Sequence, residues 1–175
     1  EFMIGMSVKE KEEKATKTTK SNSEQLRPAF WELTLEALRA SSVDLFNNIN
    51  PSKDHWLSAG SGLRACPFSM IFSVKEARVE FYMSRSHGEE NKYIFDRLFQ
   101  QKSAIEEAFG DALEWQRLDN KKACRIQFSK AFDGYNQENW PQMVDWLVSH
   151  IGLLEATFAN PLVEIKQSLK NSDLK

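Results

Sequence analysis

Two short stretches of alternating side chains lie close together near the middle of the chain. Residues 68–73 and residues 78–83 each alternate between apolar side chains and mostly polar ones. Successive side chains of a β-strand point to opposite faces, so this period of two predicts two strands that each bury one face. The link between them, residues 74–77, is short enough for a hairpin, and we expect the two strands to pair antiparallel.

Further segments add three strands and three helices to this hairpin. Apolar residues that recur every three or four positions predict amphipathic helices. These helices are expected over residues 28–46, 90–109 and 138–158. The additional strands are expected over residues 55–58, 113–118 and 123–129. The sequence therefore predicts a two-layer α+β domain of order α-βββ-α-ββ-α, in which three helices cover one face of a five-stranded, mainly antiparallel sheet.

The length and composition agree with a single globular domain. The chain has 175 residues, of which 41% are hydrophobic and 11% aromatic, and its formal net charge is -2. The aromatic share excludes an acidic disordered chain, and the charge excludes a strongly basic protein that coats nucleic acid. We expect the domain to span residues 25–160. A disordered leader (residues 1–24, beginning with vector-derived Glu1-Phe2) would precede it, and a loose C-terminal tail (residues 161–175) would follow.

The sequence favours a cytoplasmic location without membrane contact. No window holds the run of about 18 apolar residues that a membrane helix needs, and the first apolar residues are too few for a secretory signal. Cys66 and Cys124 are far apart in the sequence, so two reduced thiols in the core are the simpler interpretation.

Polar and charged side chains share one face of two predicted strands. Glu76, Arg78 and Glu80 alternate along one strand, and Arg125 and Gln127 alternate along the last strand. If the helices cover the apolar face, these side chains gather on the opposite one. The simplest interpretation is a solvated face with cross-strand ion pairs. The functional alternatives are a polar binding platform and a catalytic cluster.

A metal-dependent hydrolase is the enzymatic alternative. Restriction-type nucleases need an acidic residue on one strand and Glu-x-Lys on the next to hold a divalent cation. The nearest match is Glu76-Ala77-Arg78, where a permanently protonated arginine replaces the lysine. The candidates for a Mg²⁺-dependent or degenerate site of this kind are Asp54, His55, Glu76 and Glu80. Otherwise we predict no cofactor and no metal ligand, because the cysteines and histidines lack zinc-site spacing.

A loop of small residues follows the expected strand over residues 55–58. Gly60 and Gly62 flank Ser61, and Arg64 comes two residues later. Such a loop lets the backbone approach a phosphate group, to which an arginine can donate two hydrogen bonds. The pattern is neither a P-loop nor Gly-x-Gly-x-x-Gly, and a strand rather than a helix follows it. A flexible turn is therefore the simpler interpretation.

Several longer segments resemble one bacterial family. They are Pro51–Leu57, Lys75–Glu80, Glu89–Lys92, Phe109-Gly110 with Leu113–Trp115, and Phe132–Asn136 with Asn139–Pro141. In this order they are similar to the domain of unknown function numbered 4268, over about Arg27 to Phe158. That family occurs alone or C-terminal to a nuclease-like part, which implies a role in DNA processing or in defence against foreign DNA. The resemblance implies no catalytic residues.

We therefore expect a non-catalytic binding or interaction module of a bacterial DNA-processing or defence-associated protein. Its partner would be a nucleic acid or a protein, and a homodimer is an open alternative. The residues expected to contact phosphate groups or a partner are Arg64, Arg78, Arg85, Lys92, Arg125 and Tyr135.

Overall fold

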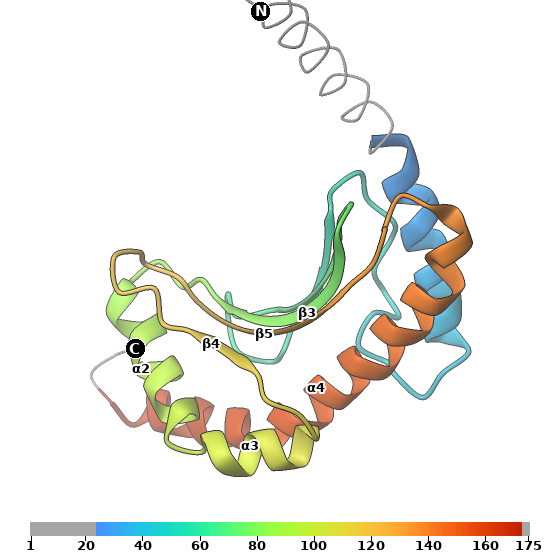
Figure 1. Cartoon of the computed structure of the whole chain (residues 1–175). Coiled ribbons are helices and arrows are strands. Elements are labelled where there is room, and N and C mark those ends of the chain that lie inside the picture. The colour runs from blue at the N-terminus through green and yellow to red at the C-terminus, as the bar shows by residue number, and fades with distance from the viewer. Residues whose placement is uncertain (1–23, 173–175) are drawn as a thin grey trace, which may run out of the picture.

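A five-stranded antiparallel sheet forms the centre of the molecule (Figure 1). The computed structural model describes residues 24–172, so nearly all of the expected leader lies outside the described residues. The strands are β1 (Trp56–Ala59), β2 (Phe68–Phe72), β3 (Glu76–Met83), β4 (Glu114–Gln116) and β5 (Cys124–Ala131). They are arranged in the order β1-β2-β3-β5-β4, and every neighbouring pair is antiparallel. The predicted α+β fold, including the β2–β3 hairpin, is confirmed.

Four α-helices accompany this sheet in the described part of the chain. A helix over residues 24–39 precedes β1. Between β3 and β4 lie α2 (Gly88–Phe99) and α3 (Lys102–Phe109), where the sequence had predicted one continuous helix. The chain turns at Gln100 and Gln101, whose amides close α2 on Asp96 and Leu98, and this turn lets Ile105 and Phe109 bury their side chains separately from those of α2. A short 3-10 turn, η1 (Gln137–Asn139), leads into α4 (Trp140–Lys170).

The first helix is shorter than its apolar pattern predicts. It ends at residue 39 rather than at Phe46. The hydroxyl of Ser41 donates to the carbonyl of Leu38 over 2.6 Å and accepts from the amide of Val43 over 3.1 Å. Serine side chains compete with the helical backbone in this way, so the helix stops, while Phe46 still reaches the core from the turn that follows.

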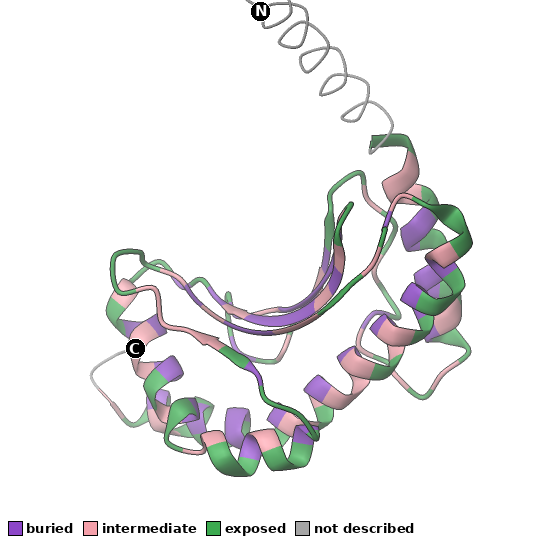
Figure 2. Cartoon of the chain, viewed as in Figure 1, coloured by how far each residue is buried: buried purple, intermediate pink, exposed green. Residues whose placement is uncertain are grey.

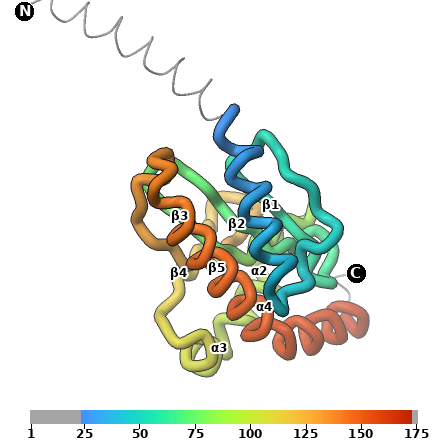
Figure 3. Tube along the Cα trace, turned by 90° about the vertical axis from the view of Figure 1, so that its right-hand side faces the viewer, coloured from blue at the N-terminus to red at the C-terminus, as the bar shows by residue number. Residues whose placement is uncertain are grey.

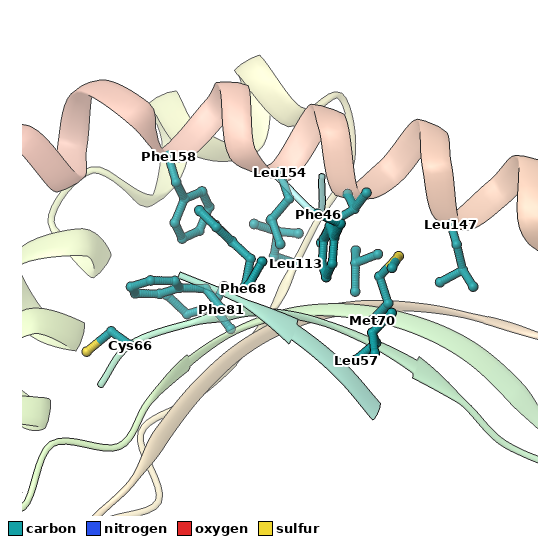
Figure 4. Close-up of a cluster of buried hydrophobic side chains, with 14 of the residues drawn as sticks. Phe46, Leu57, Cys66, Phe68, Met70, Phe81, Leu113, Leu147, Leu154 and Phe158 are labelled. Atoms are coloured by element: carbon teal, nitrogen blue, oxygen red, sulfur yellow. The ribbon is translucent and has the colours of Figure 1, made fainter. Parts of the chain in front are cut away.

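The hydrophobic core lies between the convex face of the curved sheet and α4 (Figures 1 and 4). Leu147, Leu154 and Phe158 of α4 point toward the sheet, where Met70, Phe68 and Phe81 meet them (Figure 4). The burial pattern of α4 follows the same division, with buried residues toward the sheet and exposed ones outward (Figure 2). The first helix adds Phe30, whose ring stacks on Phe72 at 4.0 Å and meets Trp140 edge-on at 5.3 Å.

The last helix does not end near Phe158, as the sequence predicted, but continues to Lys170. Pro161 lies inside the helix, where it removes one backbone hydrogen bond and bends the axis. Figure 3 shows α4 changing direction along its length. The helix continues because Leu162, Ile165 and Leu169 extend its buried stripe at helical spacing. Most of the expected loose tail is therefore packed helix. No helix in the described residues is long and apolar enough to cross a membrane.

Gly134 is required by a close approach between two turns. A β-carbon at this position would lie 1.9 Å from the carbonyl oxygen of Ser73, a backbone atom that cannot rotate away. We expect Gly134→Ala to lower the free energy of unfolding by at least about 2 kcal/mol, because the turn after β5 must shift. Urea titration measures the change.

Gly60→Ala is the matched control, since a β-carbon there meets no atom within 4 Å. We expect it to change the free energy of unfolding by less than about 0.5 kcal/mol. Equal effects of the two substitutions would contradict the close approach at Gly134.

Candidate functional site

The concave face of the sheet is turned away from the helices (Figure 1), and the strand register places mostly polar side chains on it. Strand alternation and register bring these side chains together in rows. In one row Ser69, Glu80 and Gln127 are neighbours, and in the next Ile71, Arg78 and Ser129 are neighbours. The polar sheet face consists of Trp56, Ser58, Ser69, Ile71, Glu76, Arg78, Glu80, Tyr82, Glu114, Gln116, Arg125, Gln127 and Ser129.

Glu80 lies at the centre of the polar sheet face between two arginines. Its Oε2 atom is 2.8 Å from Nε of Arg125 and 3.6 Å from Nε of Arg78. Arg78 also reaches Oε1 of Glu76 at 3.8 Å. Only 6% of Glu80 is exposed, so this carboxylate is held inside the layer of longer side chains around it. The sequence predicted cross-strand ion pairs here. One is present, between Glu80 and Arg125, whereas Arg78 pairs with Glu76 and Glu80 of its own strand.

Burial and charge act in opposite directions on Glu80. Burial raises the pKa of the carboxyl group because it removes water from the charged form. The guanidinium groups of Arg78 and Arg125 lower it again without cancelling the effect of burial, and Glu76 adds a small increase. The folded chain therefore holds a proton on Glu80 at a higher pH than the unfolded chain does.

Several buried polar atoms of this face make no hydrogen bond within the protein. In the described residues they are Nε of Arg78, Oε2 of Glu80, Nε of Arg125 and Oε1 of Gln127, besides Nε of Arg27 elsewhere. Nε of Arg125 is only 2.8 Å from Oε2 of Glu80, but its geometry does not satisfy a hydrogen bond, whereas Nε of Arg78, at 3.6 Å, is too far away. The amide nitrogen of Gln127 donates to Glu114 over 2.9 Å, which leaves the amide oxygen without a donor. Two of these atoms, Nε of Arg125 and Oε2 of Glu80, are partners in an ion pair, so Nε of Arg78 and Oε1 of Gln127 are the ones left without a close partner.

An exposed aromatic side chain borders the polar sheet face at the edge strand β1. Trp56 pairs with Ile71 in register, and 44% of its surface is exposed. The ring of His55 meets it edge-on at 4.7 Å. At the other end of the face, the guanidinium of Arg125 lies over the ring of Tyr82 at 5.3 Å. Both ends of the face thus offer flat aromatic surface beside charged groups.

The hydrolase candidates Asp54 and His55 lie at the start of β1. The carbonyl of Asp54 accepts from Nε1 of Trp31 over 2.9 Å, and that of His55 accepts from the amide of Phe72 over 2.8 Å. Partial burial, followed by the charges of Arg27 and Arg78, lowers the pKa of His55. In the described part of the chain, no hydrogen bond or ion pair joins these two side chains to Glu76 or Glu80.

Three of the predicted binding residues have structural partners instead. The ammonium of Lys92 donates to the carbonyls of Arg117, Leu118 and Ala123 over 2.5, 2.8 and 3.1 Å, and so holds the chain between β4 and β5. Arg85 is buried and pairs with Glu90 at 3.1 Å. Tyr135 is half-buried, with its ring 5.7 Å from that of Phe72.

The remaining predicted residues fall on two different surfaces. Arg78 and Arg125 lie on the polar sheet face, whereas Arg64 is exposed in the loop between β1 and β2. Sequence analysis had missed Trp56 and Glu114 as members of the polar sheet face. Their signal was the period of two in β1 and β4, but these strands are only four and three residues long. Their register against β2 and β5 cannot be read from so few residues.

Comparison with known proteins identifies the family. The family model described as "Domain of unknown function (DUF4268)" matches residues 26–162. The chain belongs to this family. The match extends from the first helix into α4 and includes the whole polar sheet face. Neither a curated protein nor a solved structure shows significant similarity to the chain.

Substitution of Lys92 tests whether this lysine stabilises the fold rather than serving as an exposed binding residue. We expect Lys92→Met to lower the free energy of unfolding by about 2–4 kcal/mol, because three carbonyls lose a charged donor. Lys121→Met removes an exposed lysine from the neighbouring turn and should change this free energy by less than about 0.5 kcal/mol. Chemical denaturation compares them, and a negligible effect of Lys92→Met would show that the lysine does not hold this turn.

Glu80 makes the stability of the fold depend on pH in a defined direction. Its folded-state pKa lies above the usual 4.5, so its contribution to stability is fully present below pH 4.5 and decreases as the pH rises through the folded-state pKa. Glu80→Gln cannot ionise. We therefore expect the difference in free energy of unfolding, wild type minus variant, to fall between about pH 4 and about pH 8. Urea titrations across this range measure it, and a rising difference would mean that the arginines outweigh burial.

Proposed function

We propose that this domain is a non-catalytic binding module and that its polar sheet face binds a polypeptide segment. The proposal rests on one observation above all. The polar sheet face is not covered by helices, and it combines carboxylates, guanidinium groups and the exposed ring of Trp56. A polypeptide carries backbone donors and acceptors at short intervals and side chains of both charges, so it can complement a surface of this mixed chemistry.

The charge of the polar sheet face favours a polypeptide over a nucleic acid. Three carboxylates, Glu76, Glu80 and Glu114, accompany two guanidinium groups, Arg78 and Arg125. Binding of a phosphate backbone depends on neutralisation by an excess of cations, which this face lacks. A protein segment of mixed charge complements both signs, and complementary charge suppresses wrong partners.

Trp56 supplies the apolar contact that such a surface needs. Interface energy concentrates in a few residues, among which tryptophan and arginine are enriched. Trp56 is exposed in the same cross-strand row as Arg78, with Ile71 between them, so one partner segment can cover the aromatic ring and reach the guanidinium. A role for the whole protein in DNA processing or defence is part of this proposal and is supported by the family resemblance alone.

The alternative is a metal-dependent hydrolase that uses Asp54, His55, Glu76 and Glu80. The surroundings of Glu80 distinguish the hydrolase from the binding module. Its carboxylate lies between two guanidinium groups, which compete with a divalent cation for the same oxygen atoms. This competition supports the binding module over the hydrolase.

Peptide selection followed by affinity measurement tests the proposal. Random peptides displayed on phage are selected on the immobilised chain, and synthetic copies are titrated by fluorescence polarisation. We expect Trp56→Ala to weaken the selected peptides at least about tenfold, because an interface tryptophan is lost. Ser129→Trp should also weaken them, since it places a bulky ring beside Arg78. Leu33→Ala is the control, because Leu33 is equally exposed (45%, against 44% for Trp56) but lies on the first helix.

Two outcomes would overturn the proposal. One is the failure of any peptide to be enriched, or equal affinities in wild type and both face variants. The other comes from gel shifts with single- and double-stranded DNA at low salt, with and without Mg²⁺ or Mn²⁺. DNA retention lost in Arg125→Gln would indicate a nucleic-acid surface, and cleavage lost in Glu80→Gln would indicate the hydrolase.

A further inference from the structure

A second surface, on the helical side of the sheet, concentrates positive charge around a hollow. The hollow has a volume of about 660 Å³ and lies between the loop over residues 60–66 and the C-terminal part of α4. Four cationic residues line it: Arg64, Arg85, Lys166 and Lys170. Among the described residues its lining contains no aspartate or glutamate. Its size falls within the range of small-molecule sites.

The loop that carries Arg64 is held in one conformation. Gly62 and Ala65 have positive φ angles of 90° and 58°, and the second is unfavourable for a residue with a β-carbon. The carbonyl of Ala65 accepts from the amide of Ser84 over 3.0 Å, and that of Arg64 accepts from Nη1 of Arg85 over 3.1 Å. Because the backbone of this loop is already fixed, binding requires only the side chain of Arg64 to become ordered, which lowers the entropic cost.

The cations around the hollow differ in what they can offer a ligand. Arg85 is buried, and its charge is balanced by Glu90 at 3.1 Å, so it positions the loop. Arg64, Lys166 and Lys170 are exposed, and no ion pair neutralises them within the described residues. Lys170 lies in the last turn of α4, where a positive charge is stabilised by the helix dipole. The dipole does not explain why Arg64, from a separate loop, lines the same hollow.

Apolar side chains form the floor beneath these charges. Leu63 and Leu169 line the hollow and are buried. A smaller hollow of about 310 Å³ adjoins it, shares Gly62, Leu63 and Lys166, and continues over Phe68 and Leu162. The combined surface has cationic donors at one end and apolar side chains beside them, with one carboxylate, Glu155, in the lining of the smaller hollow.

We propose that this hollow binds a small phosphate-bearing ligand whose organic part rests on Leu63 and Leu169. The phosphate oxygens accept hydrogen bonds from the guanidinium of Arg64 and from the ammonium groups of Lys166 and Lys170. The arginine can donate two parallel hydrogen bonds to one phosphate, and the lysines add compact positive charge. The site is separate from the polar sheet face and does not depend on its proposed function. Sequence analysis had identified the glycine loop and Arg64 as a possible phosphate contact, but it missed Lys166 and Lys170, because residues 161–175 were expected to form a loose tail.

Nuclear magnetic resonance titration of the full chain tests this proposal. The probes are inorganic pyrophosphate, adenosine triphosphate and a single-stranded oligonucleotide, each added at low salt without divalent cations. We expect saturable shifts of the amide signals of Gly62, Leu63 and Leu169, with tighter binding of adenosine triphosphate than of pyrophosphate because it has an organic part. The Lys166→Gln/Lys170→Gln double variant and Arg64→Gln should each weaken binding at least about tenfold.

Lys75→Gln is the control, since Lys75 is an exposed lysine at the opposite end of β2. It should leave the affinities unchanged. Circular dichroism verifies that the variants, which alter exposed side chains, remain folded. The proposal would be overturned if neither small probe gave saturable shifts, or if the double variant and Arg64→Gln both bound the probes as tightly as wild type. Tighter binding of the oligonucleotide than of the nucleotide would also overturn it, in favour of a nucleic-acid surface.

Discussion

The packing of α4 on the convex face of the sheet is the interaction on which the rest of the structure depends. One helix of 31 residues supplies a buried stripe from Trp140 to Leu169 and covers β2 and β3 along most of their length. The first helix and α3 extend this layer at its sides. One layer of helices covers the apolar face of the sheet. The concave face therefore needs no helices to bury it and can carry polar side chains.

That asymmetry explains both surfaces that we propose as sites. The polar sheet face is ordered by Glu80, which lies buried between two arginines and pairs with their guanidinium groups. The basic hollow arises at the far end of α4, where the helix continues past Pro161 and brings Lys166 and Lys170 to the loop of Arg64. In each case, packing of the core brings together charged residues that are distant in the sequence.

The sequence predicted the sheet well because its two central strands carry a clear period of two and are joined by a short link. The same period placed Glu76, Arg78 and Glu80 correctly on one face with Arg125 and Gln127. Sequence reasoning was wrong at three helix boundaries, where local signals conflicted with tertiary packing: Ser41 stopped one helix early, Gln100 divided another, and Pro161 failed to stop the last. It also assigned Lys92 and Arg85 to binding, because sequence alone cannot show that a cation is already occupied by carbonyls or by Glu90.

The central claim is that Glu80 holds Arg78 and Arg125 in place on an otherwise open face. The most direct test is ¹⁵N nuclear magnetic resonance of the arginine Nε–H groups at neutral pH. The account predicts that the signals of Arg78 and Arg125 exchange slowly with water in the wild type and become fast in Glu80→Gln, while the exposed Arg39 exchanges fast in both. Wild-type signals of Arg78 and Arg125 that exchange as fast as that of Arg39 would contradict it.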